Sequence, residues 1–278
     1  MTGQAEFTYL RYPWGVSFTG MLLVTGPGGE SVLIDTALPE AIDGFLLPQL
    51  AAAGVPAGSI RLVVNTHNHG DHAGGNARLR ELCGAEFAIH RKGADALVRN
   101  GFHPDLLFGD GTVLEAAGLR FEAVHAPGHS PDSCCILEPE SGTLFTGDAL
   151  QGLGTVYSGV ALYADPDSYL RSVAKIEALF RRGRVRRILC GHACVPYGGD
   201  VPEQEIPAFL EICRETVLRY SRAVEAYLAC CPQAGAAELG ALLLGRFGVT
   251  RAPGLPGLER NTAGAHLAAF PGGATSLL

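Results

Sequence analysis

Four side chains that can bind a metal ion lie within a short stretch of the chain, Thr66-His67-Asn68-His69-Gly70-Asp71-His72. The stretch begins where an apolar, β-branched run at residues 60–66 ends, and a helical pattern starts at Asp71. The end of a strand can present His67 and His69 on one side, and the helix start can turn Asp71 and His72 toward them. Imidazole and carboxylate ligands suit Zn²⁺ or another borderline metal such as Fe or Mn. Histidine is scarce here, at 9 of 278 residues, so this cluster predicts a metal site rather than a surface loop.

Three further ligand-type side chains repeat one design, in which an apolar strand and a small residue precede the ligand. His129 follows a predicted strand and a Pro-Gly turn, Asp148 ends the motif TGD, and His192 follows the run RILCG. Taken alone, each could be an ordinary turn residue. Together with the first cluster they supply seven ligands, enough for two adjacent ions with positions open for water.

The eight cysteines form no CxxC motif, and four of them lie in two vicinal pairs. This spacing does not suit a disulfide framework. They are typical of a reduced chain that uses cysteine as a small buried apolar residue. An alternative is a thiolate metal site formed by Cys190 and Cys194 beside His192. The histidines and aspartates offer a better ligand set.

Composition excludes several classes of protein. Apolar residues make up 47% of the chain and charged residues 18%, so a large core is expected and global disorder is excluded. The net charge of −7 argues against a nucleic-acid or anionic-membrane binder, because phosphate contacts are made mainly by Lys and Arg. The first fifteen residues lack the basic and apolar regions of a signal peptide. We expect a soluble, cytoplasmic protein whose partner is a small-molecule substrate.

The hydrophobic pattern divides the chain near residue 200. Before it, strand and helix patterns alternate, with strands expected at 16–25, 31–36, 60–66, 86–90, 119–124, 133–137, 143–146 and, as the last strand, 186–191. An uninterrupted helix is expected from 71 to about 83, and residues 100–111 are expected to form a loop. Asp165 and Pro166 predict a helix start, as N-cap and first helical residue. We therefore predict a catalytic domain at 1–200 and a helical extension at 201–278, with helices at 206–227, 234–247 and near the end.

The order HxHxDH, His, TGD and GH resembles the metallo-β-lactamase superfamily of hydrolases over about residues 16–195. The resemblance implies an α/β fold, the αββα four-layer sandwich, with the site at one edge and a C-terminal helical appendage. It implies two metal sites joined by one bridging carboxylate. His67, His69 and His129 would form the first site, Asp71, His72 and His192 would form the second, and Asp148 would bridge them. Two such ions, Zn being the first expectation, lower the pKa of a bridging water toward ~7, and the hydroxide attacks a carbonyl. Asp71 and Asp148 are the carboxylates expected to be catalytic.

Asp35 matches the aspartate that ends a strand in this superfamily. The resemblance implies that it lies behind the ligands and holds the histidine loop. The alternative is an ordinary turn aspartate. We expect a structural role for His125 and assign none to His90, His103 or His266.

The residues also favour one branch of the family. The oxygen-reducing flavo-diiron branch has Glu where this chain has His69, and true β-lactamases lack the aspartate that corresponds to Asp148. The sequence THNHGDHAGGN at 66–76 is close to the pattern of glyoxalase II, which leaves the glyoxalase II-like thioesterases and lactonases. Tyr197 is displaced from the position of the family's glutathione-binding tyrosine, and no basic cluster is evident near it. Glutathione thioesters are therefore not expected.

The loop at residues 149–164 is apolar, has no charged side chain and carries Tyr157 and Tyr163. Beside a dinuclear site it would form a substrate pocket suited to an apolar acyl chain. The alternative is that the loop only packs under the C-terminal helices.

Two other functions stay open at this point. Persulfide dioxygenases share this fold and use a single iron held by two histidines and an aspartate, which makes a mononuclear oxidoreductase the alternative to a thioester, lactone or ester hydrolase. The extension at 201–278 could be a DNA-binding unit, but its arginines are sparse. A lid or the surface of a homodimer is the better expectation for it.

Overall fold

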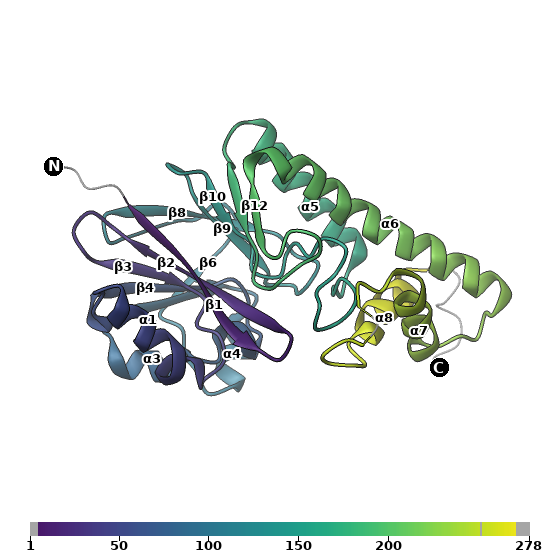
Figure 1. Ribbon diagram of the computed structural model, residues 1–278, viewed down its shortest axis with the longest axis horizontal. Coiled ribbons are helices and arrows are strands. Elements are labelled where there is room, and N and C mark those ends of the chain that lie inside the picture. Colours follow the sequence, from purple (N-terminus) through teal and green to yellow (C-terminus); the bar gives the residue numbers. More distant parts are fainter. Residues whose placement is uncertain (1–4, 251, 271–278) are drawn as a thin grey trace.

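The computed structural model describes residues 5–250 and 252–270, which form two six-stranded sheets flanked by helices (Figure 1). The first sheet contains, in spatial order, β1 (Glu6–Trp14), β2 (Ser17–Thr25), β3 (Ser31–Ile34), β4 (Ile60–Asn65), β5 (Glu86–His90) and β6 (Leu106–Phe108). The second contains β12 (Asp200–Pro202), β11 (Arg187–Leu189), β10 (Thr143–Phe145), β9 (Cys134–Glu138), β8 (Leu119–His125) and β7 (Val113–Ala116).

Both sheets mix parallel and antiparallel pairs. In the first sheet β1, β2 and β3 are antiparallel neighbours, whereas β3 to β6 run parallel. In the second sheet only β10 and β11 are parallel. Parallel neighbours bring their carboxyl ends to the same edge, which is where loops that carry ligands can meet.

Alternating side chains of each central strand enter two different cores. Val32 and Ile34 of β3 pack between the sheets, and Leu33 faces the helices outside. In β9, Ile136 packs between the sheets and Leu137 faces outward. Strands buried on both faces are continuous apolar runs, as these are. The predicted αββα four-layer sandwich is confirmed.

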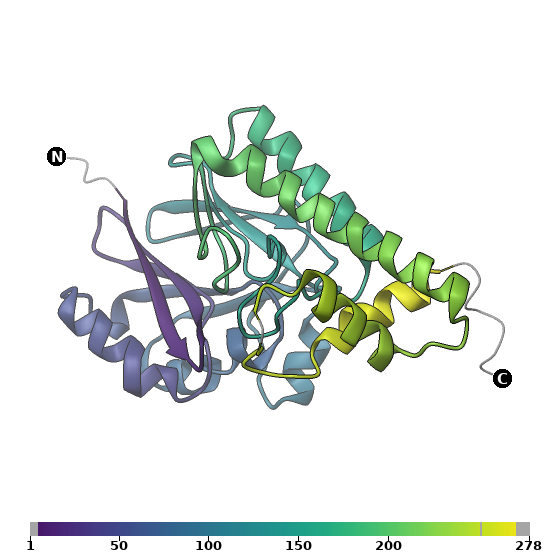
Figure 2. The same ribbon diagram turned by 45° about the vertical axis from the view of Figure 1, so that its right-hand side comes forward.

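The helices form the two outer layers. The outer face of the first sheet is covered by a π-helix (Ile42–Leu46), α1 (Leu47–Ala52), α3 (Asn76–Leu82) and α4 (Ala94–Arg99). The short α2 (Gly70–Ala73) lies at the edge between β4 and α3. On the second sheet, α5 (Pro166–Arg181) and α6 (Ile206–Cys230) run side by side (Figures 1 and 2). The carboxylate of Asp165 accepts a hydrogen bond from the backbone amide of Ser168, so the predicted N-cap of α5 is confirmed.

The C-terminal region consists of α6, α7 (Ala236–Phe247) and α8 (Glu259–Ala269). The apolar stripe predicted for α6 is buried, including Phe209, Val217 and Tyr220. Figure 2 shows α7 and α8 at one end of α6, beside the loops of the second sheet. Within the described ranges, no helix is long and apolar enough to cross a membrane.

One expected helix is divided at two glycines that pack closely against backbone atoms. The helix expected from 71 to 83 is interrupted at Gly74 and Gly75, so α2 and α3 are separate. A Cβ atom on Gly75 would lie 2.5 Å from the carbonyl oxygen of Thr36, and one on Gly74 would lie 2.3 Å from that of Gly70. This close packing breaks the helix just after the metal-ligand stretch.

Other differences concern β1, β6 and β12, three strands that the sequence pattern did not predict. β1 was not expected, and residues 100–111 were expected to be a loop, although β6 pairs there with β5. β6 has three residues, too few to show an alternating pattern. The strand at 186–191 is not the last one, since β12 crosses residue 200 and pairs with β11.

Candidate metal centre

All seven predicted ligands lie at one edge of the sandwich, on loops or in the short helix α2. His67 and His69 follow β4, and Asp71 and His72 belong to α2. The others follow strands of the second sheet: His129 follows β8, Asp148 follows β10, and His192 follows β11. Four segments from the two sheets therefore meet at this edge, and the structure brings all seven side chains together.

The first group consists of three imidazoles. Nδ1 of His69 lies 3.0 Å from Nε2 of His67 and 3.0 Å from Nε2 of His129. Ligand atoms of these three residues lie within 4.8 Å of one another, close enough for one ion. Burial, together with the neighbouring imidazoles, lowers the pKa of His67 well below its ordinary value. A neutral imidazole keeps the lone pair that a metal requires.

The second group combines two imidazoles with a carboxylate. Nε2 of His192 lies 3.2 Å from Nε2 of His72 and 3.2 Å from Oδ2 of Asp71. These ligand atoms also lie within 4.8 Å of one another. His72 and His192 are buried, whereas Asp71 is partly exposed toward solvent.

Asp148 lies between the two groups. Its Oδ1 is 3.3 Å from Nε2 of His72 and 3.4 Å from Nε2 of His192, and its Oδ2 is 3.5 Å from Nε2 of His129. Oδ1 is buried and has no hydrogen-bond partner among the described residues. A buried carboxylate oxygen without a partner is costly, and a bound cation would satisfy it.

The charge balance of the cluster also favours cations. Within the described residues, the ion-pair partners of Asp71 and Asp148 are all histidines. Burial alone would lower the pKa of His72, but the carboxylates of Asp148 and Asp71 outweigh it and raise that pKa well above its ordinary value. Without metal, protons on imidazoles are the cations available to these carboxylates. The donor set of five imidazoles and two carboxylates fits divalent borderline metals.

Hydrogen bonds behind the ligands fix which imidazole nitrogen faces the centre. Nδ1 of His129 donates to the carbonyl oxygen of Leu162 at 3.0 Å, and Nδ1 of His192 donates to that of Phe18 at 2.7 Å. A carbonyl can only accept, so a neutral ring keeps Nε2 unprotonated and available for a metal.

Asp35 lies behind the second group, where the resemblance placed it. Its Oδ2 accepts hydrogen bonds of 2.8 Å from Nδ1 of His72 and from Oγ1 of Thr66, and its Oδ1 accepts one from the backbone amide of Thr66. The backbone of Asp35 has φ 61°, in the left-handed region. Desolvation of this buried carboxyl group raises its pKa, while His72 opposes the shift.

Sequence reasoning did not single out Asp132 or Gln151. Oδ1 of the buried Asp132 accepts from Nδ2 of Asn68 at 2.9 Å and from Oγ of Ser130 at 2.7 Å. It thereby joins the loop between His67 and His69 to the loop after His129. Oε1 of Gln151 accepts from the amide of Leu162 at 2.7 Å, which supports the carbonyl that orients His129. An aspartate in a Pro-Asp-Ser turn has an ordinary structural explanation, so its pattern carried no signal.

The remaining histidines and cysteines lie outside the two ligand groups. Nε2 of His125 donates to the carbonyl oxygen of Pro131 at 2.9 Å, and its ring stacks on His90 at 4.2 Å between centroids. A hydrogen bond with Cys194, together with burial, raises the pKa of Cys190 well above its ordinary value. A protonated thiol is a poor ligand, and no cysteine belongs to the ligand groups of the described chain.

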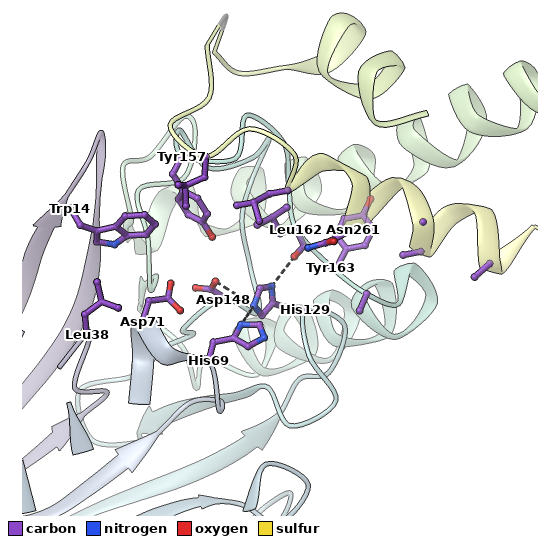
Figure 3. A pocket seen from close by; sticks show the side chains of 16 residues that line it. Trp14, Leu38, His69, Asp71, His129, Asp148, Tyr157, Leu162, Tyr163 and Asn261 are labelled. Atoms are coloured by element: carbon purple, nitrogen blue, oxygen red, sulfur yellow. Dashed lines mark hydrogen bonds and ion pairs between the residues drawn. The ribbon is translucent and has the colours of Figure 1, made fainter. Parts of the chain in front are cut away.

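A cavity of about 820 Å³ opens onto the centre (Figure 3). His69, Asp71, His129 and Asp148 form its floor, and both Tyr157 and Tyr163 line it. The Tyr157 ring lies 4.8 Å from that of His192 between centroids. The loop at 149–164 therefore faces the centre and also packs under the C-terminal helices, because the buried Tyr163 contacts His266 of α8 at 2.8 Å.

Comparisons with known proteins point the same way. The sequence model of the family described as Metallo-beta-lactamase superfamily matches residues 14–192. A hydroxyacylglutathione hydrolase of Maricaulis maris is 30% identical over 188 residues, which are 68% of this chain and 67% of that protein. An atrochrysone carboxyl ACP thioesterase of Aspergillus fumigatus is 35% identical over 159 residues, 56% of this chain. The match spans only 46% of that thioesterase.

Solved structures share the fold. A metallo-beta-lactamase family protein of Thermus thermophilus has a TM-score of 0.69 at 22% identity, covering 95% of this chain and 92% of that one. A metallo-beta-lactamase of Pontibacter korlensis has a TM-score of 0.60 at 21% identity, and the match covers 77% of this chain and 94% of that one. The chain thus belongs to the metallo-beta-lactamase superfamily, as its motifs predict.

Proposed function

We propose that this protein is a metal-dependent hydrolase that holds two divalent ions and cleaves a thioester, lactone or ester. The observation that carries the proposal is the position of Asp148, whose two carboxylate oxygens face different ligand groups, one of them without a hydrogen-bond partner among the described residues. A carboxylate so placed would bind both ions and set the distance between them.

The chain's own residues have separate tasks in this proposal. His67, His69 and His129 would hold the first ion, and Asp71, His72 and His192 the second. When bound, such a pair of ions, Zn²⁺ being the first choice, supplies an activated water nucleophile and polarises the carbonyl group. His69 and Asp71 line the cavity, so a substrate can reach both groups.

The relatives support an acyl-transfer substrate. One is named an ACP thioesterase and another a hydroxyacylglutathione hydrolase, and a thioester is the linkage common to both names. Among the described residues that line the cavity, none is a lysine or arginine, so no counter-charge for the carboxylates of glutathione is present. We therefore favour an uncharged small-molecule thioester over a glutathione conjugate or a nucleic acid.

The thiol chemistry supports a reducing compartment such as the cytoplasm. All eight cysteines are unpaired, and five of them are buried. Secreted proteins commonly pair such thiols, whereas cytosolic proteins keep them reduced.

Metal analysis combined with a substrate screen tests the proposal. Purified protein should contain two divalent ions per chain, measured by elemental mass spectrometry, and should hydrolyse acyl thioesters of N-acetylcysteamine. Acyl-CoA, glutathione thioesters and acyl-homoserine lactones extend the screen to other leaving groups. Activity should disappear on chelation and return on adding Zn²⁺ or Mn²⁺.

The same measurements separate the mononuclear alternative. A persulfide dioxygenase would hold one iron and consume oxygen with a persulfide substrate. One tightly bound iron, with no second site that Zn²⁺ or Mn²⁺ can fill, would overturn the dinuclear hydrolase.

A further inference from the structure

The residues that line the cavity lie on both sides of the ligand groups. Figure 3 shows Trp14 and Leu38 on one side, the ligands in the middle, and Leu162, Tyr163 and Asn261 on the other. We call the part of the cavity that is lined by α8 the α8 lobe. The cavity-facing positions of this helix, Asn261, Gly264, Ala265 and Ala268, have helical spacing.

The α8 lobe is apolar and made largely of small residues. Asn261 is the one polar side chain that α8 contributes, and Leu258 closes the wall where the helix begins. The described acidic side chains of the whole cavity are Asp71 and Asp148, which belong to the ligand groups. A charged substrate group would find no counter-charge here, whereas a hydrocarbon chain would lose its contact with water.

The α8 wall is held in a defined position. Oγ1 of Thr262 donates to the carbonyl oxygen of Ala161 at 2.8 Å, and the hydroxyl of Tyr163 lies 2.8 Å from Nε2 of His266. All three side chains that make these bonds are buried. The carbonyl oxygen of Leu162, the residue between Ala161 and Tyr163, accepts the hydrogen bond from Nδ1 of His129. The wall is thus connected to the first ligand group through adjacent residues of one loop.

We propose that the α8 lobe binds the apolar acyl group of the substrate, and that Ala265 and Ala268 set the longest chain accepted. This inference rests on the proposed hydrolase function and names its substrate class, an uncharged medium- or long-chain acyl thioester. The cavity of about 820 Å³ lies in the range of sites that enclose a drug-sized ligand, far more than an acetyl group needs. Methyl side chains at these positions leave that volume open.

Substitution of these alanines should shorten the chain that fits. Each buried CH₂ contributes about fourfold in affinity, and leucine carries three more carbons than alanine. In Ala268→Leu the ratio of kcat/KM for dodecanoyl over acetyl N-acetylcysteamine thioesters should fall by about 60-fold. Ala269→Leu is the matched control, because Ala269 is also exposed on α8 but does not line this cavity.

A binding measurement on metal-free protein tests the lobe without relying on catalysis. Calorimetric titration measures this binding directly and needs no reporter side chain near the lobe. Saturated fatty alcohols, which carry no charge, should bind more tightly to wild type and to Ala269→Leu as their chain length increases. In Ala268→Leu, affinity should stop increasing at a shorter chain.

The outcomes distinguish the two proposals. Parallel chain-length curves for all three proteins, in both assays, overturn the α8 lobe as the acyl site. Failure of metal-loaded wild type to hydrolyse any thioester, lactone or ester, with length-dependent binding of fatty alcohols retained, overturns the hydrolase but keeps the lobe. An early limit on chain length in Ala268→Leu alone supports the inference.

Discussion

Oδ2 of Asp35 accepts a hydrogen bond of 2.8 Å from Nδ1 of His72, and both side chains are completely buried. The bond directs Nε2 of His72 toward Asp148 and His192. Asp35 reaches this position with a left-handed backbone, so the strand end is shaped around the contact. We therefore expect the orientation of His72 as a ligand to depend on a residue that is not itself in either ligand group.

Asp35→Asn should weaken metal binding without unfolding the protein. Asparagine tolerates the left-handed backbone, but its amide can no longer supply the charged acceptor for His72. Zinc affinity, measured by competition with a chromophoric chelator, should fall by about 10- to 100-fold. Thr66→Val is the control, since it removes the hydroxyl bonded to Asp35 and leaves the bond to His72. Unchanged zinc affinity in Asp35→Asn would contradict the positioning role.

Asp148→Ala should weaken both the metal-loaded and the metal-free protein. The loaded variant should lose the second ion and orders of magnitude in turnover, because the carboxylate faces both groups. The metal-free variant should have a lower free energy of unfolding, because the carboxylate that pairs with the buried imidazoles of His72, His192 and His129 is removed. Metal content and urea unfolding, each with and without Zn²⁺, measure both effects. Near-normal activity with two ions retained would remove Asp148 from the centre.

Much of the metal centre could be predicted because each ligand stands directly after a strand or turn visible in the sequence. His67 and His69 follow an apolar run, and Asp148 and His192 follow two short runs that form parallel neighbours in the sheet. Strand ends at one edge of a sandwich bring such residues together. The local sequence pattern therefore predicts which side chains meet at this edge of the sandwich.

The remaining features depend on partners far away in the chain. Asp132 matters because it bonds Asn68, 64 residues earlier, and no local pattern indicates that contact. The apolar stripe of α6 predicts burial but does not say what the following helices cover. That α8 forms a wall of the cavity follows from the bond between Tyr163 and His266, 103 residues apart.

Asp132→Ala should loosen the first ligand group. The carboxylate joins the loop of His67 and His69 to the loop of His129, so its loss should let the two loops separate. Affinity for the first ion should fall by about tenfold or more, measured by calorimetric titration of metal-free protein. Ser130→Ala removes one of the two bonds and should have a smaller effect. Equal affinities in both variants and wild type would show that the loops hold their positions without Asp132.

Acid should destabilise the C-terminal helices through His266. Burial lowers its pKa to about 4, from an ordinary value of 6.5. Tyr163, Tyr220 and Ser221 surround the ring, and none of them offers a negative charge that would stabilise a protonated imidazole. Between pH 6.5 and 4 the histidine is therefore protonated in the unfolded chain but not in the folded chain. Its full contribution to the free energy of unfolding is present above pH 6.5. It should decrease by about 3 kcal/mol as pH falls through the window.

Hydrogen exchange of the α8 amides, measured from pH 7 to 4.5 and corrected for intrinsic rates, isolates this contribution. Wild type should lose protection in α8 as pH falls. His266→Gln should show a flatter dependence, because glutamine can still accept the hydrogen bond from Tyr163 but does not titrate in this range. His90→Gln is the control: the pKa of His90 is also lowered to about 4, chiefly by burial, but this residue ends β5 and lies outside the C-terminal helices. If His266→Gln loses protection with the same slope as wild type, another group controls the acid sensitivity of α8.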